Sequence, residues 1–388
     1  MRVLVVAGPG LVADPGLLED LTAAEAAALG VPGRFTVAAD ATSFRAELDG
    51  TQEDCAVVAL PGPDPAARRL VETPEAFSPR TVWLDLARVG SLPAAGGAAH
   101  LRGRGVFGLV WAIRHAVHRL RRPALRIPYG GHADQWGELR LPPPADGSPP
   151  PVAVLIHGGY WRSIWEADLM DALAIDLADR GYASWNMEYR RPDLHGWDAT
   201  TADVAAGVAA LSEIDAPLDL GRIAVIGHSA GGQLALRVAA DTAQALDTPQ
   251  AAETRWSGEG MGPKGAGSPR VALAVSLAGV LDLVEADRRR VGAGAVADAL
   301  GGTAEEIPEV YAASSPMERL PLGMPQIVVQ GASDDPDLLD SGRRYARAAG
   351  QEAFYLELPG DHFDVIDPAA PIWRATADAM DSSLGARR

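Results

Sequence analysis

The chain has 388 residues, which is long for one domain and sufficient for two domains that each bury a core of their own. It carries 51 acidic and 34 basic residues, a formal net charge of −17 at pH 7. Residues 1–122 contain 13 Arg and 13 Asp or Glu, so the whole negative excess belongs to residues 123–388. Such an acidic region repels phosphate backbones and anionic membranes, and we therefore expect neither nucleic acid nor membrane as a partner.

Cysteine content and apolar segments bear on the compartment. Cys55 is the single cysteine, so the chain forms no intrachain disulfide. The apolar stretch at the N-terminus is too short for a signal peptide, and no segment reaches the 18 apolar residues of a membrane span. We expect a cytoplasmic protein.

The first 122 residues repeat a strand–helix rhythm. Strand-like runs at 2–8, 35–40, 55–62 and 81–86 alternate with helix-like stretches such as 17–30, and an apolar helical segment at 106–120 closes the unit. This alternation predicts a small flavodoxin-like parallel sheet. The Gly-Pro-Gly at 8–10 lacks the patterns of a phosphate-binding loop, so we interpret it as a turn.

In order and length, residues 1–122 resemble a type II dehydroquinase, whose first strand also ends in a Gly-Pro turn and whose last helix follows a GVFG-like segment. The loop at 11–21 contains no Arg or Tyr, although that family keeps its catalytic arginine and tyrosine there. Residues 38–48 do not show the active-site signature of that family, which includes Asn and Glu, and His100 stands without the expected neighbours. We therefore expect a non-catalytic domain. Because that family forms trimers and larger rings, the resemblance implies a homo-oligomer assembled through this domain.

The second half begins near the basic residues Arg119, Arg121 and Arg122, so we place the domain boundary after residue 122 and assign 123–388 to the second domain. Residues 129–142 indicate an opening hairpin. The Pro-rich stretch 141–151 predicts a stiff loop between the first strands, or alternatively an interdomain linker.

Two glycine turns in the second domain carry the chemistry. A buried-strand run at 151–156 leads into His157, Gly158 and Gly159, a turn typical of oxyanion holes. A β-branched run at 223–226 leads into Gly-His-Ser-Ala-Gly, which places Ser229 in a nucleophile elbow between a strand and a helix. The backbone N–H groups of Gly158, Gly159 and Ala230 are the predicted oxyanion donors.

A catalytic acid and a histidine should follow Ser229 in chain order. Asp334 and Asp335 follow one predicted strand, and His362 follows the next. We favour Asp334 as the acid, with Asp335 as the alternative, because either could serve as a turn former. His157 and His228 are interpreted as structural.

Aromatic side chains surround these motifs, and four of them are candidate substrate contacts: Tyr160, Trp161, Tyr189 and Phe363. The alternative for aromatic residues here is ordinary core packing. Residues 281–316 lie where cap helices are expected over the site. Residues 241–270 are polar and glycine-rich, which predicts a solvated loop or, alternatively, a lid.

Several segments together carry a family resemblance: HGGYWR at 157–162, NMEYRRP at 186–192, GHSAGG at 227–232, SLAGVLDL at 276–283, ASSPMERLP at 313–321 and GDHF at 360–363. Residues 127–388 resemble the kynurenine formamidase (arylformamidase) and related carboxylesterase branch of the α/β-hydrolases. The resemblance implies hydrolysis of a formamide, amide or ester bond in a small, often aromatic substrate. It also implies a Ser229–His362–Asp334 triad, with no metal and no organic cofactor.

Other functions share this elbow and stay open. An acyltransferase, thioesterase or cyclase of a specialised pathway would use the same residues. A bifunctional protein with a live dehydratase half is disfavoured by the missing catalytic residues. A non-catalytic scaffold is disfavoured because Ser229, Asp334 and His362 are all present.

Overall fold

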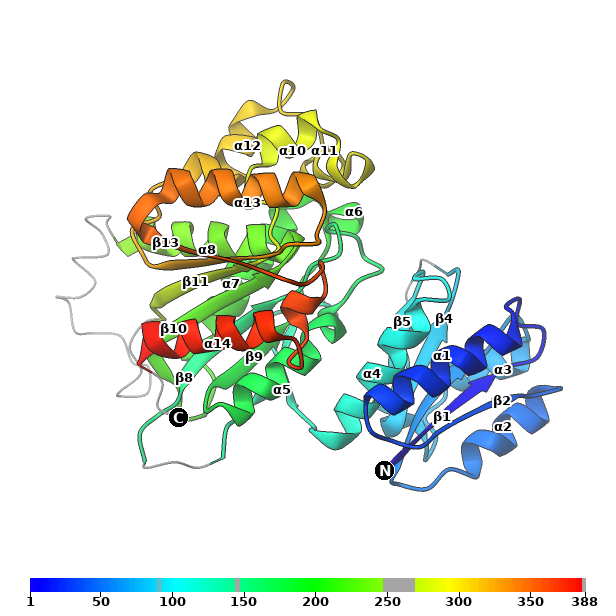
Figure 1. Cartoon of the computed structure of the whole chain (residues 1–388). Helices are drawn as coiled ribbons and strands as arrows, with labels where there is room; N and C mark the ends of the chain where they lie inside the picture. Colours follow the sequence, from blue (N-terminus) through cyan, green and yellow to red (C-terminus); the bar gives the residue numbers. More distant parts are fainter. Residues whose placement is uncertain (89, 91, 144–146, 247–268, 386–388) are drawn as a thin grey trace. The chain divides into compact units, whose positions relative to one another are not determined.

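The computed structural model describes residues 1–88, 90, 92–143, 147–246 and 269–385. It forms two compact units, Met1–Ala124 and Leu125–Arg388. Both units consist of a β-sheet with flanking helices, and the predicted two-domain α/β class is confirmed (Figure 1).

The N-terminal unit contains a five-stranded parallel sheet in the order β2-β1-β3-β4-β5. Its strands are β1 (Arg2–Ala7), β2 (Gly33–Val37), β3 (Cys55–Leu60), β4 (Thr81–Asp85) and β5 (Ala99–Arg102). Its helices are α1 (Pro15–Ala28), α2 (Ala41–Asp49), α3 (Pro65–Arg69) and α4 (Gly108–Arg121), with short 3₁₀ turns η1 (Leu70–Glu72) and η2 (Ser78–Arg80). The sequence predicts four of these strands. β5 was missed because its four residues are too few to show a period.

Both faces of this sheet are buried because successive side chains of a strand point in opposite directions. In β1, Val3 and Val5 pack in one core cluster with residues of α1 and α4. Leu4 and Val6 pack in a second cluster with residues of α2 and α3. The unit is therefore a three-layer sandwich, which the βαβ rhythm predicts.

The C-terminal unit contains an eight-stranded sheet in the order β13-β12-β11-β10-β8-β9-β7-β6. Its strands are β6 (Leu125–Pro128), β7 (Trp136–Arg140), β8 (Pro151–Ile156), β9 (Ala183–Met187), β10 (Asp219–His228), β11 (Val271–Leu277), β12 (Gln326–Gly331) and β13 (Ala353–Leu358). β6 pairs antiparallel with β7, and β7 pairs antiparallel with β9, whereas the strands from β8 to β13 run parallel. β6 and β7 form the opening hairpin.

Helices cover both faces of this sheet. They are α5 (Asp171–Asp179), α6 (Pro192–His195), α7 (Trp197–Ala209), α8 (Ala230–Leu246), α10 (Leu283–Arg288), α11 (Ala295–Leu300), α12 (Pro308–Ser314), α13 (Pro336–Ala349) and α14 (Pro371–Leu384). Short 3₁₀ turns are η3 (Ala167–Met170), η4 (Ala210–Ser212), η5 (Val291–Ala293), η6 (Pro316–Arg319), η7 (Gly350–Glu352) and η8 (Asp364–Ile366). In Figure 1, α5 and α14 lie on one face, and α7, α8 and α13 on the other. The Trp373 indole N–H donates to Asp176 at 2.7 Å and joins α14 to α5.

The connection between β11 and β12 carries α10, η5, α11 and α12, which form the short cap predicted at 281–316. Helix α8 continues to Leu246, so residues 241–246 of the predicted loop are helical, because the apolar spacing of α8 extends into the polar stretch. Residues 247–268, and 144–146 of the Pro-rich stretch, lie outside the described part of the chain. Among the helices that are described, none combines the length and apolar character needed to cross a membrane.

Candidate active site

The predicted nucleophile lies in a tight turn between strand and helix. β10 ends at His228 and α8 begins at Ala230, so Ser229 alone forms the turn. Its φ of 54° is in the left-handed region, which side chains other than glycine seldom adopt. A Cβ atom on Gly227 would lie 1.9 Å from the carbonyl oxygen of Gly231, so only glycine fits at 227. The strand–turn–helix predicted from the sequence is present.

The structure brings the predicted acid and base together. Nδ1 of His362 lies 2.9 Å and 3.1 Å from the two carboxylate oxygens of Asp334. The Gln330 side-chain amide donates to the same carboxylate at 2.7 Å, and the backbone N–H of Asp335 donates to it at 2.6 Å. The carboxylate of Asp335, the alternative acid, instead accepts from the backbone N–H of Asp337 and caps α13.

His228, next to the nucleophile, fixes the loop of His362. Burial and the nearby charge of His362 lower the pKa of His228 to about 3, so its imidazole is neutral. Its Nε2 donates to the backbone carbonyl of His362 at 2.9 Å, and the two ring centroids are 4.8 Å apart. Ser229 forms no hydrogen bond to His362 among the described residues; such bonds often tighten only when substrate is bound. The structure thus brings His362 against Asp334 and holds its loop to the residue before Ser229, and the roles of the three residues stay predictions.

The second glycine turn lies against Ser229. A Cβ atom on Gly158 would lie 2.9 Å from the Cβ of Ser229, and one on Gly159 would lie 2.3 Å from the ring of Trp165. The backbone N–H groups of Gly158 and Gly159 donate to no backbone carbonyl in the described ranges. Ala230 opens α8, so its N–H has no partner within the helix. Unpaired N–H groups beside the nucleophile are the donors that a developing oxyanion needs.

Comparison with protein families identifies this region. Residues 139–338, more than half of the chain, match the model of the BD-FAE family, an α/β-hydrolase esterase family. The chain belongs to the BD-FAE family. The matched region includes Ser229 and Asp334 and ends before His362. The N-terminal unit lies outside it.

Individual relatives support this assignment. Esterase LipC from Mycobacterium tuberculosis is 29% identical over 277 residues, which are 66% of this chain and 63% of LipC. Hydrolase LUC6 from Fusarium sp is 29% identical over 180 residues, 43% of this chain and 36% of LUC6. The match thus spans less than two thirds of either curated relative. Among solved structures, esterase B from Lactobacillus Rhamnosis matches with a TM-score of 0.52 and 19% identity, over 67% of this chain and 85% of that one, which shows the shared fold.

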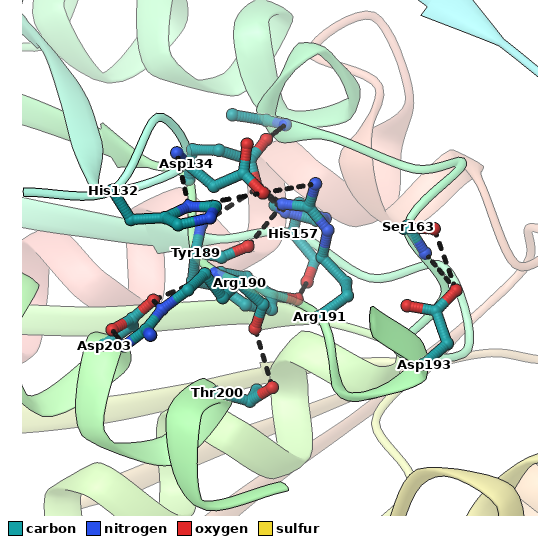
Figure 2. A network of polar contacts seen from close by, with 12 residues as sticks. His132, Asp134, His157, Ser163, Tyr189, Arg190, Arg191, Asp193, Thr200 and Asp203 are labelled. Atoms are coloured by element: carbon teal, nitrogen blue, oxygen red, sulfur yellow. Dashed lines mark hydrogen bonds and ion pairs between the residues drawn. The ribbon is translucent and has the colours of Figure 1, made fainter. Parts of the chain in front are cut away.

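Within the BD-FAE region, a buried polar network supports the 157–159 turn (Figure 2). Nε2 of His157 lies 3.1 Å from Glu188, and Nδ1 lies 2.8 Å from the carbonyl of Gly158. The Tyr189 hydroxyl donates to the carbonyl of His157 at 2.7 Å, and the Arg191 guanidinium donates to Glu188. Burial and the charge of Arg191 lower the pKa of His157 to about 3, so its single N–H donates to one of its two acceptors at a time. The prediction of a structural His157 agrees with these contacts.

The four predicted substrate contacts divide by exposure. Tyr160 and Phe363 are each 42% exposed. Trp161 is buried but lines, with Tyr160 and residues of the cap helix α11, a cavity of about 220 Å³. Tyr189 differs from the prediction, because its ring is fully buried and stacked on His157, beneath the turn rather than in a pocket.

Trp161 also anchors a chain of hydrogen bonds from the turn to the cap. Its indole N–H donates to the Gln233 side chain on α8 at 3.2 Å. The Gln233 amide donates to the carbonyl of Ser314 at the end of α12 at 2.8 Å. The Trp197 indole N–H donates to the Ser314 hydroxyl at 2.8 Å. The turn, the helix that follows the nucleophile and the cap are therefore joined through buried polar groups.

The N-terminal unit holds an Asp–His pair of its own, of which the sequence identifies only His100. Nε2 of His100 lies 2.8 Å from Asp85, and Nδ1 accepts from the backbone N–H of Leu92 at 3.2 Å. Both carboxylate oxygens of Asp85 accept from Arg68, at 2.8 Å and 3.0 Å. Burial alone would raise the pKa of Asp85, but the hydrogen bonds from His100 and Arg68 hold it well below its usual range.

Sequence reasoning missed the residues that support the site. Glu188 and Arg191 lie in the segment 186–192, which contributes to the family resemblance but whose sequence predicts no role for either residue. A signal was available, since both are charged residues directly after a buried strand, where charges need partners. His228, interpreted only as structural, gave no sequence sign of its contact with residue 362.

Proposed function

We propose that this chain is a serine esterase acting on a small acyl substrate, with Ser229 as nucleophile, His362 as base and Asp334 as the orienting acid. The observation that carries the proposal is the contact of Nδ1 of His362 with Asp334, in a loop held to the residue before Ser229. This arrangement leaves Nε2 of His362 available to the nucleophile. Membership in an esterase family supports the proposal.

In the first half of the reaction, Ser229 Oγ attacks the acyl carbonyl and its proton passes to Nε2 of His362. Asp334 stabilises the imidazolium that forms. The negative charge on the carbonyl oxygen is met by the N–H groups of Gly158, Gly159 and Ala230. Each such donor contributes on the order of 3 kcal/mol to transition-state stabilisation.

The first half ends when His362 gives its proton to the leaving oxygen or nitrogen, the C–O or C–N bond breaks and the acyl-enzyme forms. In the second half, the acyl-enzyme is hydrolysed. His362 takes a proton from water, whose oxygen attacks the Ser229 ester. Collapse of this intermediate releases the carboxylic acid and returns the proton to Ser229.

The finer substrate class rests on the exposed aromatic rings. Tyr160 and Phe363 flank the site and offer flat apolar surface to an aromatic leaving group. They support the more specific proposal of a formamidase of the kynurenine formamidase type. Acyltransferase, thioesterase and cyclase activities use the same elbow and remain the alternatives.

A labelling experiment tests the proposal. A fluorophosphonate probe should form an adduct that peptide mass spectrometry maps to Ser229, and Ser229→Ala should lose the adduct and the turnover of p-nitrophenyl acetate. Labelling elsewhere, or full turnover by Ser229→Ala, would overturn the esterase. N-formylkynurenine is the second substrate to be tested. Turnover of esters without turnover of N-formylkynurenine would contradict the formamidase proposal and agree with the esterase proposal.

For residues 1–122 we propose a non-catalytic role in folding or self-association. The support is the missing arginine and tyrosine of the dehydroquinase-like loop, together with a His100 whose two ring nitrogens are both engaged. Dehydration of 3-dehydroquinate by the full chain would contradict this role. Light scattering should show a homo-oligomer if the unit serves assembly.

A further inference from the structure

A cluster of two histidines and an aspartate lies outside the proposed triad. His132 and Asp134 belong to the loop between β6 and β7, and His195 ends α6. One ligand atom from each of the three lies within 4.8 Å of the others. The rings of His132 and His195 meet edge to face with centroids 4.7 Å apart. Two separate segments of the chain thus bring three possible ligand atoms near one another, and Nδ1 of His132 also accepts the backbone N–H of Asp134.

The donor set suits a divalent transition metal. Zn²⁺ prefers imidazole nitrogen and carboxylate oxygen, and three protein ligands plus water form a common tetrahedral site. At metal–ligand distances of about 2.0–2.1 Å the donors would stand about 3.3 Å apart. His132 and His195 are exposed and Asp134 is half-buried, so rotation of the side chains can close the remaining gap.

The local charge also permits a cation, although two arginines are near. The Arg190 guanidinium donates to both carboxylate oxygens of Asp203, at 2.7 Å and 2.8 Å. Arg191 donates to Glu188, and it lies 3.4 Å from Asp134 (Figure 2). Three carboxylates therefore face two guanidiniums, which leaves one negative charge beside the histidines.

We propose that His132, Asp134 and His195 bind one divalent transition-metal ion such as Zn²⁺. The ion would tie the 129–135 loop to α6 and draw Asp134 from Arg191. Arg191 in turn holds Glu188, which contacts His157 in the glycine turn. Metal binding therefore changes the contacts of Arg191 and Glu188 that hold the glycine turn, and it lowers the rate of hydrolysis.

Calorimetric titration of the full, chelator-treated chain tests the site directly. ZnCl₂ should bind with one equivalent at a Kd of about 10 µM or tighter, and MgCl₂ should give no binding heat. His132→Ala and His195→Ala should each raise the Kd at least about tenfold. His118→Ala, a histidine of the N-terminal unit, is the matched control and should leave the Kd unchanged.

Two further measurements use the unaltered chain, so they do not depend on whether the alanine variants fold. Co²⁺ should give the visible absorption of a four-coordinate nitrogen–oxygen site in the unaltered chain, and Zn²⁺ should raise its Tm. Absence of Zn²⁺ binding, or an unchanged Kd in both alanine variants, would overturn the site.

The effect on the turn is measured separately. Saturating Zn²⁺ should lower the turnover of p-nitrophenyl acetate at least about twofold in the unaltered chain and not in His195→Ala. An equal rate would overturn the link to the turn. This readout rests on the proposed esterase, whereas the titration does not, so the two failures are distinguishable.

Discussion

Both units of this chain place an aspartate–histidine pair on neighbouring parallel strands or the loops that follow them, yet the surroundings of the two pairs differ. In the C-terminal unit, Nδ1 of His362 contacts Asp334, the histidine side chain is 23% exposed, and Ser229 lies close by. In the N-terminal unit, His100 is 4% exposed, both its ring nitrogens have partners, and Asp85 is also bound by Arg68. We expect only the pair in the C-terminal unit to support hydrolysis, because the proposed mechanism also needs a nucleophile and a ring nitrogen that can take its proton.

The largest expected effect is on turnover, and it separates the two pairs. Asp334→Asn should lower kcat for p-nitrophenyl acetate on the order of 10³- to 10⁴-fold, because the histidine loses the group that orients it and stabilises its charge. Asp85→Asn is the matched change in the other unit and should leave kcat within about twofold. It should instead destabilise its own unit by about 3 kcal/mol, because Arg68 loses its charged partner, and calorimetry would show this as a lower Tm. Equal losses of kcat in both variants would contradict the proposed difference between the Asp334–His362 and Asp85–His100 pairs.

The second largest effect is expected in the pH dependence of stability, which should differ between the two units. The pKa values of His157 and His228 are lowered from 6.5 to about 3, so the unfolded chain takes up protons that the folded chain excludes. Their contribution to stability is complete above pH 6.5 and is lost as the pH falls toward 3, by about 2 kcal/mol for each histidine at pH 5. Asp85, with a lowered pKa, keeps its contribution down to about pH 3.8 and loses it below.

Calorimetry at pH 7 and pH 5 measures this difference. The C-terminal transition should move to lower temperature at pH 5, while the transition that Asp85→Asn affects should stay in place. His228→Gln removes one of the two titrating groups and should reduce the shift by about half. A pH-independent C-terminal Tm would contradict the neutral burial of both histidines.

A smaller effect is expected at the residue that joins the two catalytic loops. His228→Leu removes the hydrogen bond to the carbonyl of His362 and should lower kcat about tenfold, since a buried hydrogen bond contributes about 1 to 1.5 kcal/mol. His228→Gln keeps an N–H donor and should recover part of the rate. The labelling rate with fluorophosphonate should fall in parallel with kcat, and a Leu variant with the original rate would show that the contact does not position His362.

The smallest effect concerns the cap. A Cβ atom on Gly292, whose φ is 62°, would lie 2.4 Å from the Tyr160 ring, so Gly292→Ala should displace that ring. The KM for an aromatic ester should rise about threefold, roughly the effect of weakening one aromatic contact, while the KM for an acetate ester with a small alcohol stays the same. Gly301→Ala is the control, because no atom lies within 4 Å of the position of its Cβ. An equal change in the KM values of both esters would show that Tyr160 does not select aromatic substrates.

The sequence shows the parts of the site that depend on local rules. Glycines around Ser229 and at 158–159 are visible because a tight turn excludes larger residues, and Asp334 and His362 follow strands that are apolar enough to recognise. The contacts of Glu188 with His157 and of Asp85 with Arg68 join residues 31 and 17 positions apart. Such pairings depend on which strands become neighbours, and a single sequence does not contain the strand order. The sequence also does not predict the burial of Tyr189, because an aromatic residue after a strand can lie in a core or in a pocket.

The hydrogen bonds from Trp161 through Gln233 to Ser314 have a consequence for the design of new specificities. A cap exchanged between relatives would keep the glycine turn in register only if it again presented a carbonyl oxygen at the position of Ser314. A replacement without that acceptor would leave a buried amide unsatisfied beside α8 and loosen the helix that carries the nucleophile turn. The exchangeable part of the cap therefore ends before Ser314, because the position of this one carbonyl oxygen, rather than the overall shape of the cap, limits the exchange.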